Sequence, residues 1–154
     1  MIFVGAKMKF SIVIPTYNEA KDIADTIRAI LLLEYDDYEV IIVDDSTDNT
    51  AEIIKRFNDP RITLIRPEVR DGRCGARNIG ILASNGEVVV ILNADVRLPV
   101  DYLNKILEHY KAGFDYVLVK AKVSNNQDLL ARYVDSVSQM IEGRQDPQWM
   151  QWTE

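Results

Sequence analysis

The sequence predicts an α/β fold, a Rossmann-like, doubly wound and mostly parallel sheet with helices on both faces. Residues 40–43 and 88–92 are unbroken runs of valine, isoleucine and leucine. Strands that are covered on both faces need such runs, whereas half-exposed strands alternate apolar with polar residues. Between the strands, apolar residues recur at the spacing of amphipathic helices. Strands that alternate with helices are typical of parallel α/β sheets.

Length and composition are those of one ordinary globular domain. The chain has 154 residues, of which 47% are apolar and 27% are charged. It contains no apolar run of about 18 residues that would suggest a membrane span. One cysteine and one histidine exclude an internal disulfide, a multi-cysteine metal cage, a histidine-based zinc site and Ser-His-Asp chemistry. The net charge of -6 argues against bulk nucleic-acid binding. We expect a cytoplasmic protein, with any membrane association supplied by parts outside this sequence.

The first strand and helix are expected within residues 9–31. The strand, residues 9–15, ends at Pro15, which cannot donate a ladder hydrogen bond and therefore belongs at a strand end. Asn18 in the following loop is a candidate cap for the next helix. That helix is predicted from apolar residues at positions i, i+4, i+7 and i+8, which are Ile23, Ile27, Ile30 and Leu31.

The second unit carries the first candidate site. Its strand, residues 38–43, ends at Asp44 and Asp45, and ligands of open α/β sheets bind beyond the carboxyl ends of the strands. Two adjacent carboxylates repel each other unless a cation or hydrogen-bond donors compensate them, which favours a ligand site. The alternative is that such residues only end a strand and cap a helix, and for Asp48 this alternative is preferred. Asn49 is the predicted N-cap of the next helix, with Glu52 at its third position.

The third unit is predicted to bind an anion. A short strand, residues 61–66, is followed by a loop and a helix rich in small residues, residues 67–80. Gly72 and Gly75 allow close backbone approach at the amino end of a helix, where free N–H groups attract anions. An alternative, compatible with this one, is that Gly75 and Gly80 let the helix pack closely on the sheet. The guanidinium groups suited to phosphate oxygens are those of Arg73 and Arg77. They belong to a cluster of five arginines in one short window, and in an acidic protein this concentration suggests a local anion site, although a solvated basic loop is equally expected for the first two: Arg61, Arg66, Arg70, Arg73 and Arg77.

The remaining sequence adds a fourth strand and further elements. Residues 87–92 are predicted as another buried strand, which ends at the polar triplet 93–95. Residues 114–123 are predicted as a fifth strand, and residues 127–142 as a helix with a broad apolar stripe. Between the fourth and fifth strands, Pro99 is expected to open a helix. The expected core face of this helix is Val100, Leu103, Ile106, Leu107 and Tyr110.

Four motifs in this order resemble those of the inverting glycosyltransferases of family two, which have the GT-A fold. Residues 11–19 (SIVIPTYNE) are similar to the family's opening strand and loop. Residues 43–48 (VDDSTD) are similar to its acidic turn, and residues 75–80 (GARNIG) to its small-residue helix. Residues 93–95 (NAD) fall where the family has its Asp-X-Asp metal motif.

The resemblance implies a division of the chain. Residues 1–8 are an N-terminal extension, and residues 9–123 are a nucleotide-sugar-binding α/β domain of GT-A type. Residues 124–154 are a helix and the start of a truncated acceptor region.

The resemblance also implies roles for single residues. Asp44 would take a polar hydrogen of the base, and Arg77 would lie near the base or the diphosphate. Asp95 would hold a divalent cation, Mg²⁺ or Mn²⁺, against the diphosphate. The base and ribose pocket would be lined by Pro15, Tyr17 and Glu19. The complete set expected to bind the nucleotide is Pro15, Tyr17, Glu19, Asp44, Asp45, Arg73, Arg77 and Asn93.

The sequence departs from the family pattern in two ways. Asn93 replaces the first carboxylate of the metal motif, so this position brings no charge to a cation. No stretch matches the acceptor-binding half, which carries the carboxylate that deprotonates the acceptor hydroxyl. The general base is therefore expected beyond Glu154, and this chain alone is expected to be inactive.

The predicted function of the full-length protein is transfer of a sugar, with inversion, from a nucleoside-diphosphate sugar to a hydroxyl of a carbohydrate or lipid-linked acceptor. A UDP-sugar is the expected donor. The alternative is a non-catalytic nucleotide-binding or regulatory module that lacks the acceptor half, which Asn93 favours. A receiver-like or phosphatase-like domain ranks last. Such domains usually carry acidic residues at the end of the first strand, and here no aspartate that could act as a nucleophile follows directly after Pro15. If an acceptor half is missing, the apolar surface that it would cover is exposed. Such a surface favours self-association, which we therefore expect.

Overall fold

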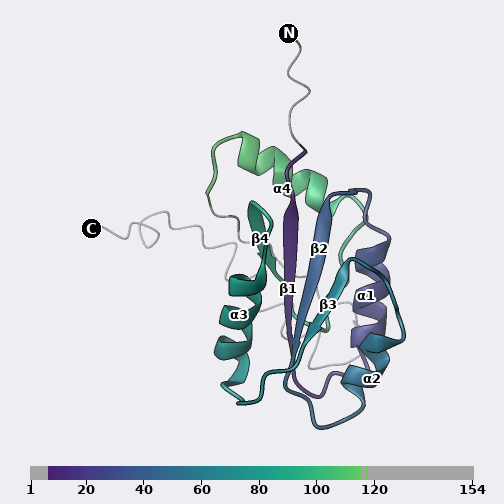
Figure 1. The fold of residues 1–154 in the computed structure, drawn as a ribbon. Helices are drawn as coiled ribbons and strands as arrows, with labels where there is room; N and C mark the ends of the chain where they lie inside the picture. The colour runs from purple at the N-terminus through teal and green to yellow at the C-terminus, as the bar shows by residue number, and fades with distance from the viewer. Residues whose placement is uncertain (1–6, 116, 118–154) are drawn as a thin grey trace, which may run out of the picture. The chain divides into compact units, whose positions relative to one another are not determined.

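The computed structural model describes residues 7–115 and 117 (Figure 1). The predicted helix over residues 127–142 lies outside the described residues, as does most of the predicted strand over 114–123; residues 114, 115 and 117 are not in a strand. In chain order the elements are β1 (Phe10–Thr16), α1 (Ile23–Leu31), β2 (Tyr38–Asp44), α2 (Thr50–Lys55), β3 (Ile62–Ile65), α3 (Gly72–Ala83), β4 (Val88–Ile91) and α4 (Tyr102–Lys111).

The strands form a 4-stranded sheet in the order β3-β2-β1-β4. Every neighbouring pair is parallel, and β1 is aligned with β2 along its whole length, from Phe10 opposite Tyr38 to Thr16 opposite Asp44. The prediction of a doubly wound parallel sheet is confirmed. Because all strands run in one direction, their carboxyl ends lie at one edge, and the polar residues that follow them are brought to that edge.

The two faces of the sheet are covered by different helices. Figure 1 shows α1 and α2 on one side and α3 on the other. The larger core, to which α4 also contributes, includes Phe10, Ile12, Ile14, Ile27, Ile42 and Leu103, and the smaller core under α3 is formed by Val13, Ile41, Val43 and Ala76. Each fully buried side chain of this size contributes about 1.5–3 kcal/mol, so these two cores account for the stability of the unit.

Close packing of α3 depends on one glycine. A Cβ atom built on Gly80 would lie 2.3 Å from Cγ1 of Val13, so no larger residue fits between this helix and β1 without a shift. The predicted packing role of Gly80 is therefore confirmed. For Gly75 the neighbour is different, because its Cβ would meet the side chain of Asp71 instead of the sheet.

Two burial predictions were wrong. The fourth strand was expected to be buried on both faces, but Val89 and Ile91 are 37% and 48% exposed. The reason is that, within the described residues, β4 pairs only with β1, and α3 packs over β1 and β2. On α4 the residues Leu103 and Ile106 are buried as expected, whereas Val100 and Tyr110 are exposed. None of the helices described is both long enough and apolar enough to span a membrane.

The amino edge of the sheet is held together by the carboxylate of Glu39. It accepts hydrogen bonds from the Ser11 hydroxyl (2.7 Å), the Lys9 ammonium (3.0 Å) and the backbone N–H of Asn85 (2.6 Å). Burial raises the pKa of Glu39, but the hydrogen bonds from Ser11, Asn85 and Lys9 outweigh it and lower the pKa to about 2. This carboxylate therefore joins β1, β2 and the segment before β4 at the end of the sheet opposite the acidic residues.

We predict that Glu39→Gln lowers the free energy of unfolding at pH 7 by about 2 kcal/mol, since each unit of pKa shift corresponds to about 1.4 kcal/mol and the amide keeps one acceptor oxygen. The folded-state pKa of Glu39 lies below 4.5, the ordinary value of a glutamate. The contribution is therefore complete above about pH 4.5 and is lost as the pH falls through about 2. Urea unfolding of both proteins between pH 2 and 7 measures this.

The matched control is Asp36→Asn. Lys7 lowers the pKa of Asp36 too, but the Asp36 side chain is 94% exposed, so its replacement should leave the free energy of unfolding unchanged. A difference between Glu39→Gln and the parent protein that does not shrink on acidification would contradict the assignment.

Candidate functional site

The carboxyl edge of the sheet brings together residues that are far apart in the sequence. Asp44 ends β2, Arg66 follows β3, and Asn93 lies two residues after β4. An open hollow of ≈ 270 Å³ at this edge is lined by Asp44, Asp45, Ser46, Thr47, Arg66, Pro67, Glu68 and Arg70. The prediction that the acidic residues after β2 and β4 share one edge is confirmed by the parallel pairing of both strands with β1.

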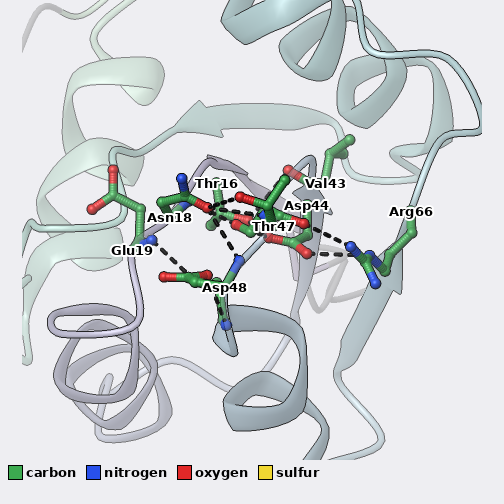
Figure 2. Close-up of polar contacts among 10 residues, drawn as sticks. Thr16, Asn18, Glu19, Val43, Asp44, Thr47, Asp48 and Arg66 are labelled. Carbon is green, nitrogen blue, oxygen red and sulfur yellow. Dashed lines mark hydrogen bonds and ion pairs between the residues drawn. The ribbon is translucent and has the colours of Figure 1, made fainter.

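Asp44 is the buried member of the acidic pair. None of its side chain is exposed, and its Oδ1 accepts hydrogen bonds from the hydroxyls of Thr16 (2.7 Å) and Ser46 (2.5 Å). Its Oδ2 lies 3.3 Å from Nε of Arg66, which is an ion pair without hydrogen-bond geometry. Figure 2 shows Arg66 beside the carboxylate. Asp44 is thus compensated by groups of the protein itself, and no atom of its side chain is accessible to a ligand in this structure.

Asp45 is the accessible member of the pair. It is half-buried, and its backbone N–H donates to the carbonyl of Thr16 (3.0 Å). Its Oδ1 is buried but has no hydrogen-bond partner among the described residues. A buried acceptor without a donor costs about 1–3 kcal/mol, so this oxygen is a place where a donor from a ligand would be favourable.

Asn18 joins the two loops at this edge. Its Oδ1 accepts hydrogen bonds from the backbone N–H of Thr47 (2.9 Å) and of Asp48 (3.3 Å), and its own N–H donates to the Ser46 hydroxyl (2.8 Å) (Figure 2). Its φ of 58° is left-handed, a conformation that asparagine tolerates better than most residues. The predicted cap role of Asn18 was wrong, because α1 begins only after Asp22. The asparagine instead fixes the loop after β1 to the turn after β2.

Asp48 caps the amino end of α2, so the preferred interpretation of this residue is confirmed. Its Oδ1 accepts hydrogen bonds from the backbone N–H (3.0 Å) and the hydroxyl (2.5 Å) of Thr50, the first residue of α2. These bonds, chiefly the one from the hydroxyl, lower the pKa of Asp48. Asn49 occupies the predicted N-cap position but makes no side-chain capping bond. The Thr50 hydroxyl also accepts from the N–H of Glu19 (3.0 Å), so α2 supports the first loop as well.

Tyr17 presents an aromatic face near the hollow. Its side chain is 55% exposed, and the guanidinium carbon of Arg70 lies 4.6 Å from its ring centroid, within cation–π range. Arg70 also lines the hollow. Pro15, by contrast, is buried within β1 opposite Val43 and is not among the residues that line the hollow.

The triplet after β4 places two polar side chains at the surface. Asn93 and Asp95 are exposed and flank the buried Ala94. Oδ1 of Asn93 accepts a long hydrogen bond (3.5 Å) from Nη2 of Arg77, whose Nε is buried without a partner among the described residues. Burial, and then the negative charge of Asp95, raise the pKa of Glu19, while Arg73 opposes them. The triplet therefore lies close to both the first loop and the amino end of α3.

The donor set at this edge fits a divalent cation only together with a ligand. Within the part of the chain that the structure describes, no group of three or more histidine, cysteine, aspartate or glutamate side chains is arranged to hold a metal ion. Asp95 is an exposed carboxylate beside a neutral amide. Mg²⁺ is commonly bound by one or two carboxylates plus phosphate oxygens, so Asp95 fits such an ion once phosphates complete the shell.

The arginine cluster divides between the two ends of the sheet. Arg61, at the start of β3, is paired with Asp59 (2.8 Å) and contacts the Tyr38 ring, away from the acidic edge. Arg66, for which a solvated loop was equally expected, lies at the hollow. The concentration of arginines in the sequence suggested an anion site that included Arg70, but neither Arg66 nor Arg70 was predicted to bind the nucleotide. For Arg66, the signal in the sequence was its position directly after a parallel strand. For Arg70, the stacking on Tyr17 leaves no pattern in the sequence.

Residues 11–153 match the model of Glycosyl transferase family 2. An uncharacterized glycosyltransferase of Nostoc sp. is 36% identical over 109 residues, which cover 69% of this chain and 34% of that protein. The poly-beta-1,6-N-acetyl-D-glucosamine synthase of Staphylococcus epidermidis is 37% identical over 126 residues, which cover 79% of this chain and 31% of that protein. The chain thus spans about a third of the length of these curated relatives.

Solved structures agree on the fold. The crystal structure of S. aureus TarS 1-349 in complex with UDP superposes with a TM-score of 0.64 at 23% identity, over 77% of this chain and 40% of that one. A mannosyltransferase from Pyrobaculum calidifontis, in complex with GDP-Man and Mn²⁺, superposes with a TM-score of 0.63 at 32% identity, over 67% of this chain and 32% of that one. The parallel α/β unit is therefore of the GT-A kind found in TarS.

Proposed function

Because the chain belongs to glycosyl transferase family 2, we propose that it is the nucleotide-sugar-binding part of an enzyme that transfers a sugar from a nucleoside-diphosphate sugar to an acceptor hydroxyl with inversion. A UDP-sugar is the proposed donor, and the proposed acceptor is a carbohydrate or a lipid-linked molecule. Solved neighbours with bound UDP, UDP-GlcNAc and GDP-Man support this class of donor. The observation that carries the proposal is the oxygen of Asp45 that has no hydrogen-bond partner among the described residues, in a hollow that Arg66 and Arg70 also line.

The base is proposed to bind at the hollow beside Asp45. We assign the contact with a base N–H to Asp45 in place of Asp44, because both oxygens of Asp44 already face groups of the protein. Its Oδ1 is bound by two hydroxyls and its Oδ2 is paired with Arg66, whereas Asp45 is only half-buried and its Oδ1 faces no donor among the described residues. The exposed ring of Tyr17 offers a face on which a base can stack. Arg70 lies on that ring at 4.6 Å, so a base that stacks there would displace it or stack together with it. Glu19 is proposed to contact the ribose.

The diphosphate is proposed to bind at the amino end of α3. This end carries Arg73 and Arg77, and the first N–H groups of a 12-residue helix attract anions through the helix dipole. The Nε of Arg77 is buried without a partner among the described residues, so a phosphate oxygen would satisfy it. Asn93, already in contact with Arg77, would donate or accept a hydrogen bond there.

Asp95 is proposed to hold a divalent cation against the diphosphate. Such a cation, when bound, would neutralise the charge of the departing nucleoside diphosphate. Since Asp95 is the proposed protein carboxylate and Asn93 is neutral, the cation depends on the phosphates for its remaining oxygen ligands. The general base for the acceptor is proposed to lie beyond Glu154, so the chain alone would bind the nucleotide without transferring sugar.

Calorimetry with UDP and with GDP, each with and without Mn²⁺, tests this proposal. We expect Mn²⁺ to raise the affinity for the nucleotide about tenfold and to bind only weakly without it. Asp95→Ala should remove this enhancement and leave binding without metal unchanged. The control is Asp101→Ala, at the residue before α4, whose side chain is 44% exposed and paired with Lys105; this variant should bind the nucleotide like the parent protein. The absence of binding by either nucleotide at millimolar concentration would overturn the proposal.

A further inference from the structure

A buried hydroxyl of α1 holds the backbone between the two polar residues of the triplet. Ala94 is 3% exposed, although its neighbours Asn93 and Asp95 are exposed. Its carbonyl accepts a hydrogen bond of 2.5 Å from Oγ1 of Thr26, which is 1% exposed. The contact joins residues 68 positions apart. One side chain inside the core is therefore in direct contact with the peptide that precedes Asp95.

This bond uses the single proton of the hydroxyl. Oγ1 of Thr26 also lies 3.4 Å from the carbonyl of Asp22, one turn earlier in α1, but that distance is long for an O–H···O bond. The proton is therefore directed to Ala94. Among the described residues, no other hydrogen bond to the Ala94 carbonyl is found, so loss of the hydroxyl would leave a buried acceptor without a donor.

Other side-chain contacts of the triplet and of Arg97, two residues after it, are weaker. Arg97 donates to the Asp25 carboxylate at 2.8 Å, but both side chains are about half exposed, and exposed ion pairs of this kind contribute little. On the other face of the sheet, Arg77 reaches Asn93 only at 3.5 Å. Of these three contacts, the bond from Thr26 is the shortest and the only one made by a buried side chain.

We propose that Thr26 is a positioning residue for Asp95. By holding the Ala94 carbonyl, it fixes the peptide plane from which Asp95 projects, and so sets the position of the carboxylate toward the cation and the diphosphate. Thr26 touches neither the nucleotide nor the metal. The inference rests on the proposed function for the role of Asp95, whereas the hydrogen bond between Thr26 and the triplet is independent of that function.

Two variants separate the hydroxyl from the shape of the side chain. Thr26→Val keeps the branched shape and removes the hydroxyl, whereas Thr26→Ser keeps the hydroxyl and removes a methyl group from the core. A role limited to packing would be harmed more by Thr26→Ser. A positioning role would be harmed more by Thr26→Val and restored by Thr26→Ser.

The first readout is the hydrogen exchange of single amides, followed by NMR. The Val96 N–H is bonded to the Asn93 carbonyl within the triplet turn (3.3 Å), and the Asp45 N–H is bonded to Thr16 at the other part of the site (3.0 Å). In Thr26→Val we expect the protection of Val96 to fall about tenfold relative to that of Asp45. In Thr26→Ser the ratio should remain that of the parent. Equal ratios in both variants, or a larger change in Thr26→Ser, would overturn the inference.

The second readout is calorimetry of UDP with and without Mn²⁺. Thr26→Val should lose most of the roughly tenfold enhancement by Mn²⁺ and keep the affinity measured without metal, and Thr26→Ser should keep both. An enhancement that Thr26→Val retains in full would overturn the inference. If the parent chain binds no nucleotide at all, the proposed function fails, and the exchange of Val96 still decides whether Thr26 positions the triplet.

Discussion

The free energy of unfolding of Asp44→Ala is expected to be lower than that of the parent protein by about 3 kcal/mol. The substitution leaves two buried hydroxyls, those of Thr16 and Ser46, without their acceptor, and each such loss costs about 1–3 kcal/mol. It also removes the ion-pair partner of Arg66. Because the Arg66 side chain is 48% exposed, water can solvate the guanidinium, and this second loss is the smaller one. Urea unfolding at pH 7 measures the change.

Asp44→Asn is the matched variant for this prediction. Asparagine keeps an Oδ1 that can accept from both hydroxyls and loses only the charge that faces Arg66. Its free energy of unfolding should fall by about 1 kcal/mol. If Asp44→Ala unfolds at the same urea concentration as Asp45→Ala, the buried network does not have the role inferred for it.

The fold was predictable because burial leaves a periodic trace in the sequence. Strands β1 and β2 are covered on both faces, and each contains an unbroken apolar run, residues 12–15 and 40–43. Helix α1 shows the predicted spacing of Ile23, Ile27 and Ile30. The same rule failed for β4. Its run of apolar residues resembles that of β2, but the number of neighbouring strands and helices decides exposure, and the local sequence does not contain that number.

The site was predictable in its position and less so in its division of roles. Asp44 and Asp45 were both expected at the carboxyl edge, and both lie there. Successive residues of a strand point to opposite faces of the sheet. Asp44 therefore lies on the same face as Ile42 and the larger core, and Asp45 lies on the same face as Val43 and the smaller core under α3. That alternation was available from the sequence. The bonds of Asn18 to Thr47, 29 positions away, were not, because only the folded chain brings the two loops together.

Binding of the nucleotide is expected to weaken about 10-fold to 150-fold in Asp45→Ala, with or without Mn²⁺. A hydrogen bond to a charged group contributes about 1.5–3 kcal/mol, which corresponds to such a ratio. The carboxylate can only accept, so it should favour a base with an N–H group on its pairing edge, as uracil and guanine have. Cytosine presents a bare nitrogen at that position, and CDP should therefore bind the parent protein more weakly than UDP.

Asp45→Asn turns this selectivity into a test of the contact itself. An amide can donate as well as accept, so the affinity for UDP should fall, the affinity for CDP should rise or stay constant, and the ratio between them should shrink about tenfold. The control is Asp101→Asn, at the residue before α4, whose side chain is 44% exposed; it should leave the ratio unchanged. Calorimetry with the two nucleotides measures all three proteins. If the ratio of the UDP and CDP affinities is the same in Asp45→Asn as in the parent, Asp45 does not contact the base. If selectivity is lost in Asp44→Asn instead, the contact with the base belongs to Asp44.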